Sequence, residues 1–84
     1  MAKVVIYSKT YCPFCVRAKS LFDDKGVSYE EIMVDSDPQM FMDLKKKTGM
    51  MTVPQIFIDD ELIGGYTDLA AFDQQGGLDP LLAK

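Results

Sequence analysis

Both cysteines of the chain lie in one short stretch, TYCPFC at residues 10–15. The stretch follows an apolar, Val/Ile-rich run at residues 4–7, which predicts a strand over 3–8 that is buried on both faces. Pro13 suits the first position of a helix, where its missing N–H costs nothing, and Gly26 suits the position just past the end. We therefore expect a helix from about 13 to 25, with the cysteine pair at the junction of strand and helix.

The following segments continue this alternation of strands and helices. Residues 27–34 predict a second strand, and the segment DSDP at 35–38, a capping residue followed by proline, predicts the start of a second helix. Gly49 is expected to end that helix. Two short apolar runs, 55–58 and 61–64, are separated by two residues and predict a hairpin.

A third helix is expected to begin at Thr67 and Asp68, which would cap and charge its start, and to run to about Gln75. Asp79-Pro80 would begin one more short turn. The resulting order is βαβαββα. Because a strand–helix–strand unit gives a parallel pair and the hairpin adds antiparallel strands, the predicted fold class is α/β, a four-stranded mixed sheet with helices on both faces.

Length and composition limit the function classes. The 84 residues allow one core, so we expect a single domain over 1–84, and 48% hydrophobic residues are typical of a globular chain. A net charge of -4 argues against a nucleic-acid partner. No apolar run approaches the roughly 20 residues of a membrane span, and the N-terminal run is too short for a signal peptide. We expect a cytoplasmic protein with no membrane partner.

Cys12 is expected to be the more reactive cysteine. At the helix N-cap its sulfur would accept hydrogen bonds from the N–H groups of Phe14 and Cys15 and meet the positive end of the helix dipole, while Lys9 adds a nearby cation. These effects lower the pKa of the Cys12 thiol. Since nucleophilicity falls with pKa at a slope of about 0.4–0.5, the lower pKa mainly makes Cys12 a better leaving group. Cys15, one turn further, is expected to be buried and less reactive.

Three other roles of the cysteine pair stay open at this point. A structural zinc site needs four ligands, and with two cysteines and no histidine it would need carboxylates or a second chain. A structural disulfide across so short a loop would add little stability. Inert core cysteines would have to meet at a strand–helix junction by chance. We favour redox chemistry and expect no metal.

Two further motifs, TVP at 52–54 and GGYTDL at 64–69, join CPFC at 12–15 in a pattern that resembles the glutaredoxins of the thioredoxin superfamily. The resemblance covers essentially the whole chain and looks like the small, dithiol, bacterial type. It implies a thioredoxin-like fold and a glutathione-dependent thiol–disulfide oxidoreductase that carries electrons in cell redox homeostasis. Glutathione would be a co-substrate, with no permanently bound cofactor. Implied partners are disulfide-containing or glutathionylated proteins, with ribonucleotide reductase as one candidate, and the protein would act as a monomer.

The resemblance also implies a set of site residues. Cys12 and Cys15 would be catalytic. Lys9 would approach the glycyl carboxylate of glutathione, Val53 its cysteinyl backbone, and Thr67 with Asp68 its γ-glutamyl end. The Val53–Pro54 bond would be cis, as in the family, although the residues alone favour a turn proline. The full expected glutathione-binding set is Lys9, Tyr11, Phe14, Thr52, Val53, Pro54, Gly65, Thr67 and Asp68.

Some positions within this pattern leave alternatives. Tyr11 would either flank the groove or pack within its own loop. Met50-Met51 stands where many glutaredoxins carry Arg or another polar residue that helps hold the glycyl end, so Lys9 or one of the lysines at 45–47 would have to compensate. Two other classes also stay open. One is a redoxin fed by thioredoxin reductase, which generally lacks the GGYTDL element. The other is a [2Fe–2S] carrier built from two chains and two glutathiones, which Pro13 disfavours.

Overall fold

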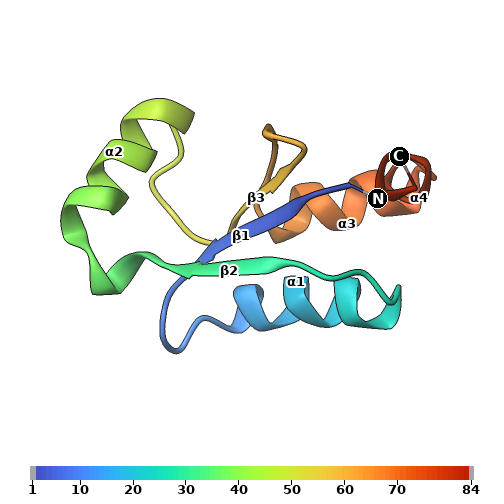
Figure 1. Cartoon of the computed structure of the whole chain (residues 1–84), viewed down its shortest axis with the longest axis horizontal. Helices are drawn as coiled ribbons and strands as arrows, with labels where there is room; N and C mark the ends of the chain where they lie inside the picture. The colour runs from blue at the N-terminus through green and yellow to red at the C-terminus, as the bar shows by residue number, and fades with distance from the viewer. Residues whose placement is uncertain (1, 84) are drawn as a thin grey trace.

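The fold is a four-stranded mixed sheet, seen in a computed structural model that describes residues 2–83 (Figure 1). The strands lie in the order β2-β1-β3-β4. Their bounds are Val4–Ser8 for β1, Glu30–Met33 for β2, Gln55–Ile58 for β3 and Glu61–Gly64 for β4. β2 runs parallel to β1, whereas β3 is antiparallel to both β1 and β4. The predicted parallel pair and hairpin are confirmed.

Helices cover both faces of this sheet (Figure 1). Their bounds are Pro13–Asp24 for α1, Pro38–Thr48 for α2, Tyr66–Gln74 for α3 and Leu78–Leu82 for α4, with a 3₁₀ turn, η1, at Val34–Ser36. The predicted order βαβαββα is therefore confirmed, with η1 and α4 as short additions. No helix within residues 2–83 is long and apolar enough to cross a bilayer.

Each face of the sheet carries its own apolar core. One core, on the side of α1, α3 and α4, consists of Val4, Ile6, Ala18, Phe22, Ile56, Ile58, Leu69, Leu78 and Leu82. The other, under α2, consists of Val34, Phe41, Leu44 and Phe57. Successive residues of a strand point to opposite faces, so β1 supplies side chains to both cores. That is why its sequence is an almost unbroken apolar run.

Local capping chemistry sets most of the element boundaries. Asp37 caps α2 by accepting a hydrogen bond from the Met40 N–H at 3.2 Å, and α2 ends at Gly49, whose φ of 77° suits a residue without a side chain. Asp59 and Asp60 both have positive φ, 51° and 68°, which makes the hairpin turn type I′.

Two predicted boundaries are corrected. The second strand covers Glu30–Met33 rather than 27–34, because Val34 already begins the 3₁₀ turn. The third helix has Gly65 as its N-cap and begins at Tyr66, so Thr67 does not cap it. The reason is that the Asp68 carboxylate reaches back to accept the Gly65 N–H at 3.0 Å, which satisfies the cap residue from inside the helix.

Candidate active site

The strand register brings three segments that are distant in the sequence to one end of the sheet. Tyr7 of β1 lies opposite Gln55 of β3, so the chain that leaves β1 and the chain that enters β3 meet at the same end. Gly64, at the end of β4, lies opposite Ile56. The segments 9–15, 50–54 and 65–68 are therefore neighbours in space.

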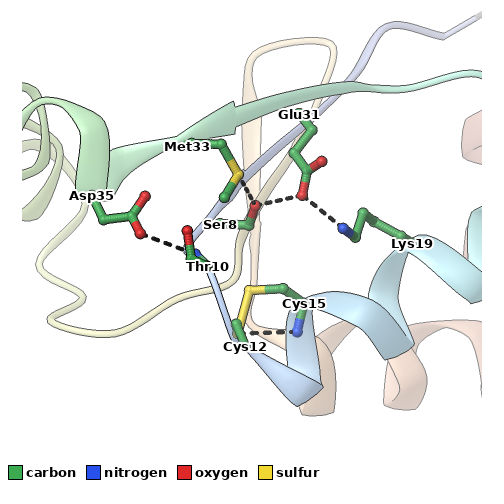
Figure 2. Close-up of polar contacts among 8 residues, drawn as sticks. All are labelled: Ser8, Thr10, Cys12, Cys15, Lys19, Glu31, Met33 and Asp35. Carbon is green, nitrogen blue, oxygen red and sulfur yellow. Dashed lines mark hydrogen bonds and ion pairs between the residues drawn. A yellow bond between two sulfur atoms is a disulfide. The ribbon is translucent and has the colours of Figure 1, made fainter.

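The two cysteines sit where the first of these segments becomes α1 (Figure 2). Cys12 is the N-cap and is joined to Cys15 by a disulfide. Its sulfur accepts a hydrogen bond from the Cys15 N–H at 3.2 Å. Among the described residues, the second expected donor, the N–H of Phe14, makes no hydrogen bond to this sulfur. Cys15 is only 1% exposed, whereas Cys12 is half-buried, so Cys12 is the sulfur that a substrate can reach.

The second segment presents backbone to the sulfur. The Val53–Pro54 peptide bond is cis, as the family resemblance predicts. The carbonyl oxygen of Val53 lies 4.0 Å from the Cys12 Sγ. Pro54 is buried and Val53 half-buried.

A cavity of about 290 Å³ connects the three segments. It is lined by Phe14, Thr52, Val53, Pro54, Gly65, Tyr66 and Thr67. All of these except Tyr66 belong to the expected glutathione-binding set. The Tyr66 ring lies 6.2 Å from that of Phe14, centroid to centroid, and the two form an aromatic wall. Sequence reasoning missed Tyr66, although its place directly after the double glycine of the GGYTDL motif was a usable signal.

Three expected residues lie outside that cavity lining. The Lys9 ammonium stands 4.5 Å from the centroid of the Phe41 ring, and the Lys45 ammonium stands 4.1 Å from the same centroid. Both cations therefore gather at α2, where aromatic faces attract them. Tyr11 is 98% exposed at a φ of 58°, which rules out packing within its loop. The Asp68 carboxylate accepts a hydrogen bond from the Gly65 N–H.

Polar contacts fix the strand ends that lead into the site (Figure 2). The Ser8 hydroxyl donates to the Glu31 Oε2 at 2.6 Å, and the Lys19 ammonium lies 2.8 Å from the same oxygen. The Lys19 cation, followed by the Ser8 hydroxyl, lowers the pKa of the Glu31 carboxyl. β1, β2 and α1 are thus linked directly beside the cysteines.

The loop before Cys12 is tied down in the same way. The Thr10 N–H donates to the Asp35 Oδ2 at 3.0 Å, and this backbone hydrogen bond lowers the pKa of Asp35.

Within residues 2–83, no three His, Cys, Asp or Glu side chains are grouped so as to hold a metal ion. The site consists of the disulfide-bonded cysteine pair, a backbone edge and an adjoining cavity.

A reachable cysteine at a helix N-cap, a buried partner three residues on and a facing cis-proline define a thiol–disulfide oxidoreductase with a thioredoxin-like fold. The family model described as Glutaredoxin matches residues 4–63. The chain therefore belongs to the glutaredoxin family. It is a glutathione-dependent thiol–disulfide oxidoreductase of cell redox homeostasis, with Cys12 and Cys15 as the redox-active pair.

Individual relatives agree over nearly the full length. The chain is 52% identical to Glutaredoxin 3 of Escherichia coli (strain K12), over 98% of this chain and 99% of that protein. It is 46% identical to a glutaredoxin of Pseudomonas aeruginosa, over 99% of both. Its structure matches the buckwheat glutaredoxin–glutathione complex with a TM-score of 0.91 and 37% identity, over 95% of this chain and 76% of that chain. A glutaredoxin from Brucella melitensis matches with a TM-score of 0.87 and 40% identity, over 98% and 89% of the two chains.

Proposed function

We propose that Cys12 is the attacking sulfur and Cys15 the resolving one. The observation that carries this assignment is the difference in burial: Cys12 is half-buried at the rim of the site, while Cys15 is 1% exposed. A Cys12 thiolate attacks the glutathione sulfur of a protein–glutathione mixed disulfide, and the protein thiolate leaves and takes up a proton. A second glutathione thiolate then attacks the sulfur that Cys12 holds, which releases Cys12 and forms oxidised glutathione.

Protein disulfides follow a second route in this proposal. Cys12 forms a mixed disulfide with one substrate sulfur, and Cys15 then attacks the Cys12 sulfur and expels the reduced substrate. The product is the Cys12–Cys15 disulfide, the form that the structure contains. Two glutathione molecules return it to the dithiol and leave as oxidised glutathione.

Glutathione is proposed to bind along the cavity that Phe14, Thr52, Pro54 and Gly65 help to line. In this arrangement the Val53 backbone pairs with the cysteinyl part of glutathione, as an extended peptide pairs with a strand edge. Thr67 and Asp68 meet the γ-glutamyl end, and Tyr11 flanks the groove. The complex of the buckwheat glutaredoxin with glutathione supports this proposal, because its fold matches this chain closely.

Lys9 and Lys45 are proposed to hold the glycyl carboxylate together. Their ammonium groups flank one ring, that of Phe41, which supports a shared anion site at the start of the groove. Lys45 would then supply the cation that Met50-Met51 lacks.

We further propose a monomeric cytoplasmic protein in which residues 1–84 form a single domain. One core cluster contains Ile6 near the start of the chain together with Leu78 and Leu82 near its end, which supports a single cooperative unit. The cytoplasm suits a dithiol pair, since glutathione keeps thiols reduced there. Ribonucleotide reductase is one candidate among the disulfide-containing protein partners.

The pair of variants Cys12→Ser and Cys15→Ser tests the assignment. With glutathione, glutathione reductase and a small glutathione mixed disulfide, we expect Cys12→Ser to abolish reduction and Cys15→Ser to retain it. With a protein disulfide as substrate, Cys15→Ser should lose activity as well. Retained activity in Cys12→Ser would contradict the assignment of roles. Reduction of the wild-type disulfide by thioredoxin reductase but not by glutathione would contradict the proposed glutathione route.

A further inference from the structure

Gln55 is a fully buried polar residue that directly follows the cis peptide bond. Its side chain is 0% exposed. The amide Nε2 donates to the Met50 carbonyl oxygen at 3.0 Å and to the Thr52 carbonyl oxygen at 3.1 Å. Its Oε1 has no hydrogen-bond partner among the described residues. Burying an amide with an unpaired oxygen costs free energy, so this residue is not an efficient way to stabilise a core.

We propose that Gln55 is a positioning residue that holds the loop 50–54 in the geometry at which the disulfide substrate binds. This inference rests on the proposed binding of glutathione at the cavity. Gln55 itself is anchored, because it belongs to the buried strand β3 and lies opposite Tyr7 of β1. The loop before it belongs to no strand or helix. Through these two hydrogen bonds, the rigid strand β3 therefore holds the irregular loop 50–54 in place.

The loop position matters because the loop forms one wall of the site. Thr52, Val53 and Pro54 line the cavity, and the Val53 carbonyl oxygen lies 4.0 Å from the Cys12 Sγ. The amide of Gln55 fixes the carbonyl of Thr52, the residue directly before Val53. Without the amide, the backbone of Val53 would sample more orientations. The substrate would then have to order this backbone when it binds.

A purely structural role makes a different prediction from a positioning role. In Gln55→Met the side chain keeps a similar length and shape but has no amide. This change removes the unpaired Oε1 together with the two donors. The two carbonyl groups lose only neutral hydrogen bonds, and the cost of the buried unpaired oxygen disappears at the same time. The fold should therefore tolerate the substitution, whereas the loop should lose its fixed position.

The experiment measures kcat and KM of Gln55→Met with a glutathionylated peptide in the glutathione-coupled assay. We expect KM to rise about tenfold, because binding must then order the backbone of about one residue that Gln55 holds in the free protein, with kcat within about twofold of the wild type. Amide hydrogen exchange at Val53 should become faster, while exchange in β1 stays unchanged.

Two control variants separate positioning from general effects. Gln75→Met makes the same chemical change at an exposed residue that follows α3, and we expect it to leave KM unaltered. Ile56→Val removes one methyl group from the core at the next residue of β3 and should lower stability without raising KM.

An unaltered KM in folded Gln55→Met overturns the inference. If that variant does not fold, Gln55→Asn takes its place, because it keeps the amide but withdraws it by one methylene. A raised KM in Gln55→Asn supports the inference, and a wild-type KM overturns it. Failure of the proposed function would instead show in the wild type, as absence of glutathione-dependent turnover.

Discussion

We expect Asp68 both to stabilise the start of α3 and to bind glutathione at the proposed site. Two substitutions separate these roles. Its carboxylate accepts the Gly65 N–H at 3.0 Å at the start of α3. In the proposed complex its negative charge also meets the ammonium group of glutathione. Asp68→Asn keeps an acceptor oxygen of the same shape and removes the charge, while Asp68→Ala removes both.

The effect on stability follows from the exposed position of this contact. Loss of an N-terminal capping interaction costs about 0.5–2 kcal/mol, and loss of an acidic charge in the first turn costs about 0.3–1 kcal/mol. For Asp68→Ala we take about 1 kcal/mol, which corresponds to a fall in Tm of about 4–8 °C in a chain of this size. For Asp68→Asn only the charge is lost, so we expect about half of that fall.

The assay compares thermal unfolding with KM for a glutathione mixed disulfide. The wild type should have the highest Tm, Asp68→Asn an intermediate Tm and Asp68→Ala the lowest Tm. Both variants should raise KM by a similar factor of about five, because an exposed charge pair is worth up to about 1 kcal/mol. Asp60→Asn in the hairpin turn is the control, since it removes one charge away from α3. A wild-type KM in Asp68→Asn would mean that Asp68 acts only on the helix.

Two further predictions concern stability. The Lys25 ammonium lies 2.6 Å from Asp79 and 2.8 Å from Asp73, and these carboxylates raise the pKa of Lys25, so its stabilising effect is present below its usual pKa and lost as pH rises through the folded value. Lys25→Met should thus have a lower Tm than the wild type at pH 7, and the difference should shrink as pH rises above the usual lysine pKa of about 10.4; a difference that stays constant with pH would refute this. Gly64 has a φ of 123°, and a Cβ there would collide with the Asp68 carboxylate, so Gly64→Ala should cost about 1–3 kcal/mol in urea unfolding. Gly49→Ala, with positive φ but open space around it, should cost less; equal losses would exclude the collision as the cause.

The sequence predicts element boundaries well where one local interaction decides them. Pro13 and Asp37-Pro38 start helices as expected, and Gly49 ends one, because each acts through its own backbone geometry or one short hydrogen bond. The expected cap of α3, Thr67, lies two residues beyond the observed one, because the Asp68 carboxylate accepts the N–H of Gly65 and makes Gly65 the cap.

The site shows the same limit at longer range. Motifs on three segments predict most of the cavity lining through the family resemblance that they carry together. No local sequence pattern indicates the direction in which a long side chain points. Lys9 was expected beside the Cys12 sulfur, yet its ammonium lies over Phe41, a ring on another element. The hydrogen bonds of Gln55 also depend on where the fold brings a loop, so its pattern as an ordinary strand residue conceals its contacts.

One physical arrangement recurs in all three segments that build the site. Their irregular backbone lacks the ladder of a strand, and a polar side chain from a regular or more rigid position supplies hydrogen bonds instead. Asp35 accepts from the Thr10 N–H, the Gln55 amide donates to the loop before Pro54, and Asp68 accepts from the Gly65 N–H. Asp35 and Asp68 are exposed, and Gln55 is buried but polar. The geometry around Cys12 is therefore set by a few polar contacts that sequence changes can adjust separately from the packing that keeps the sheet folded.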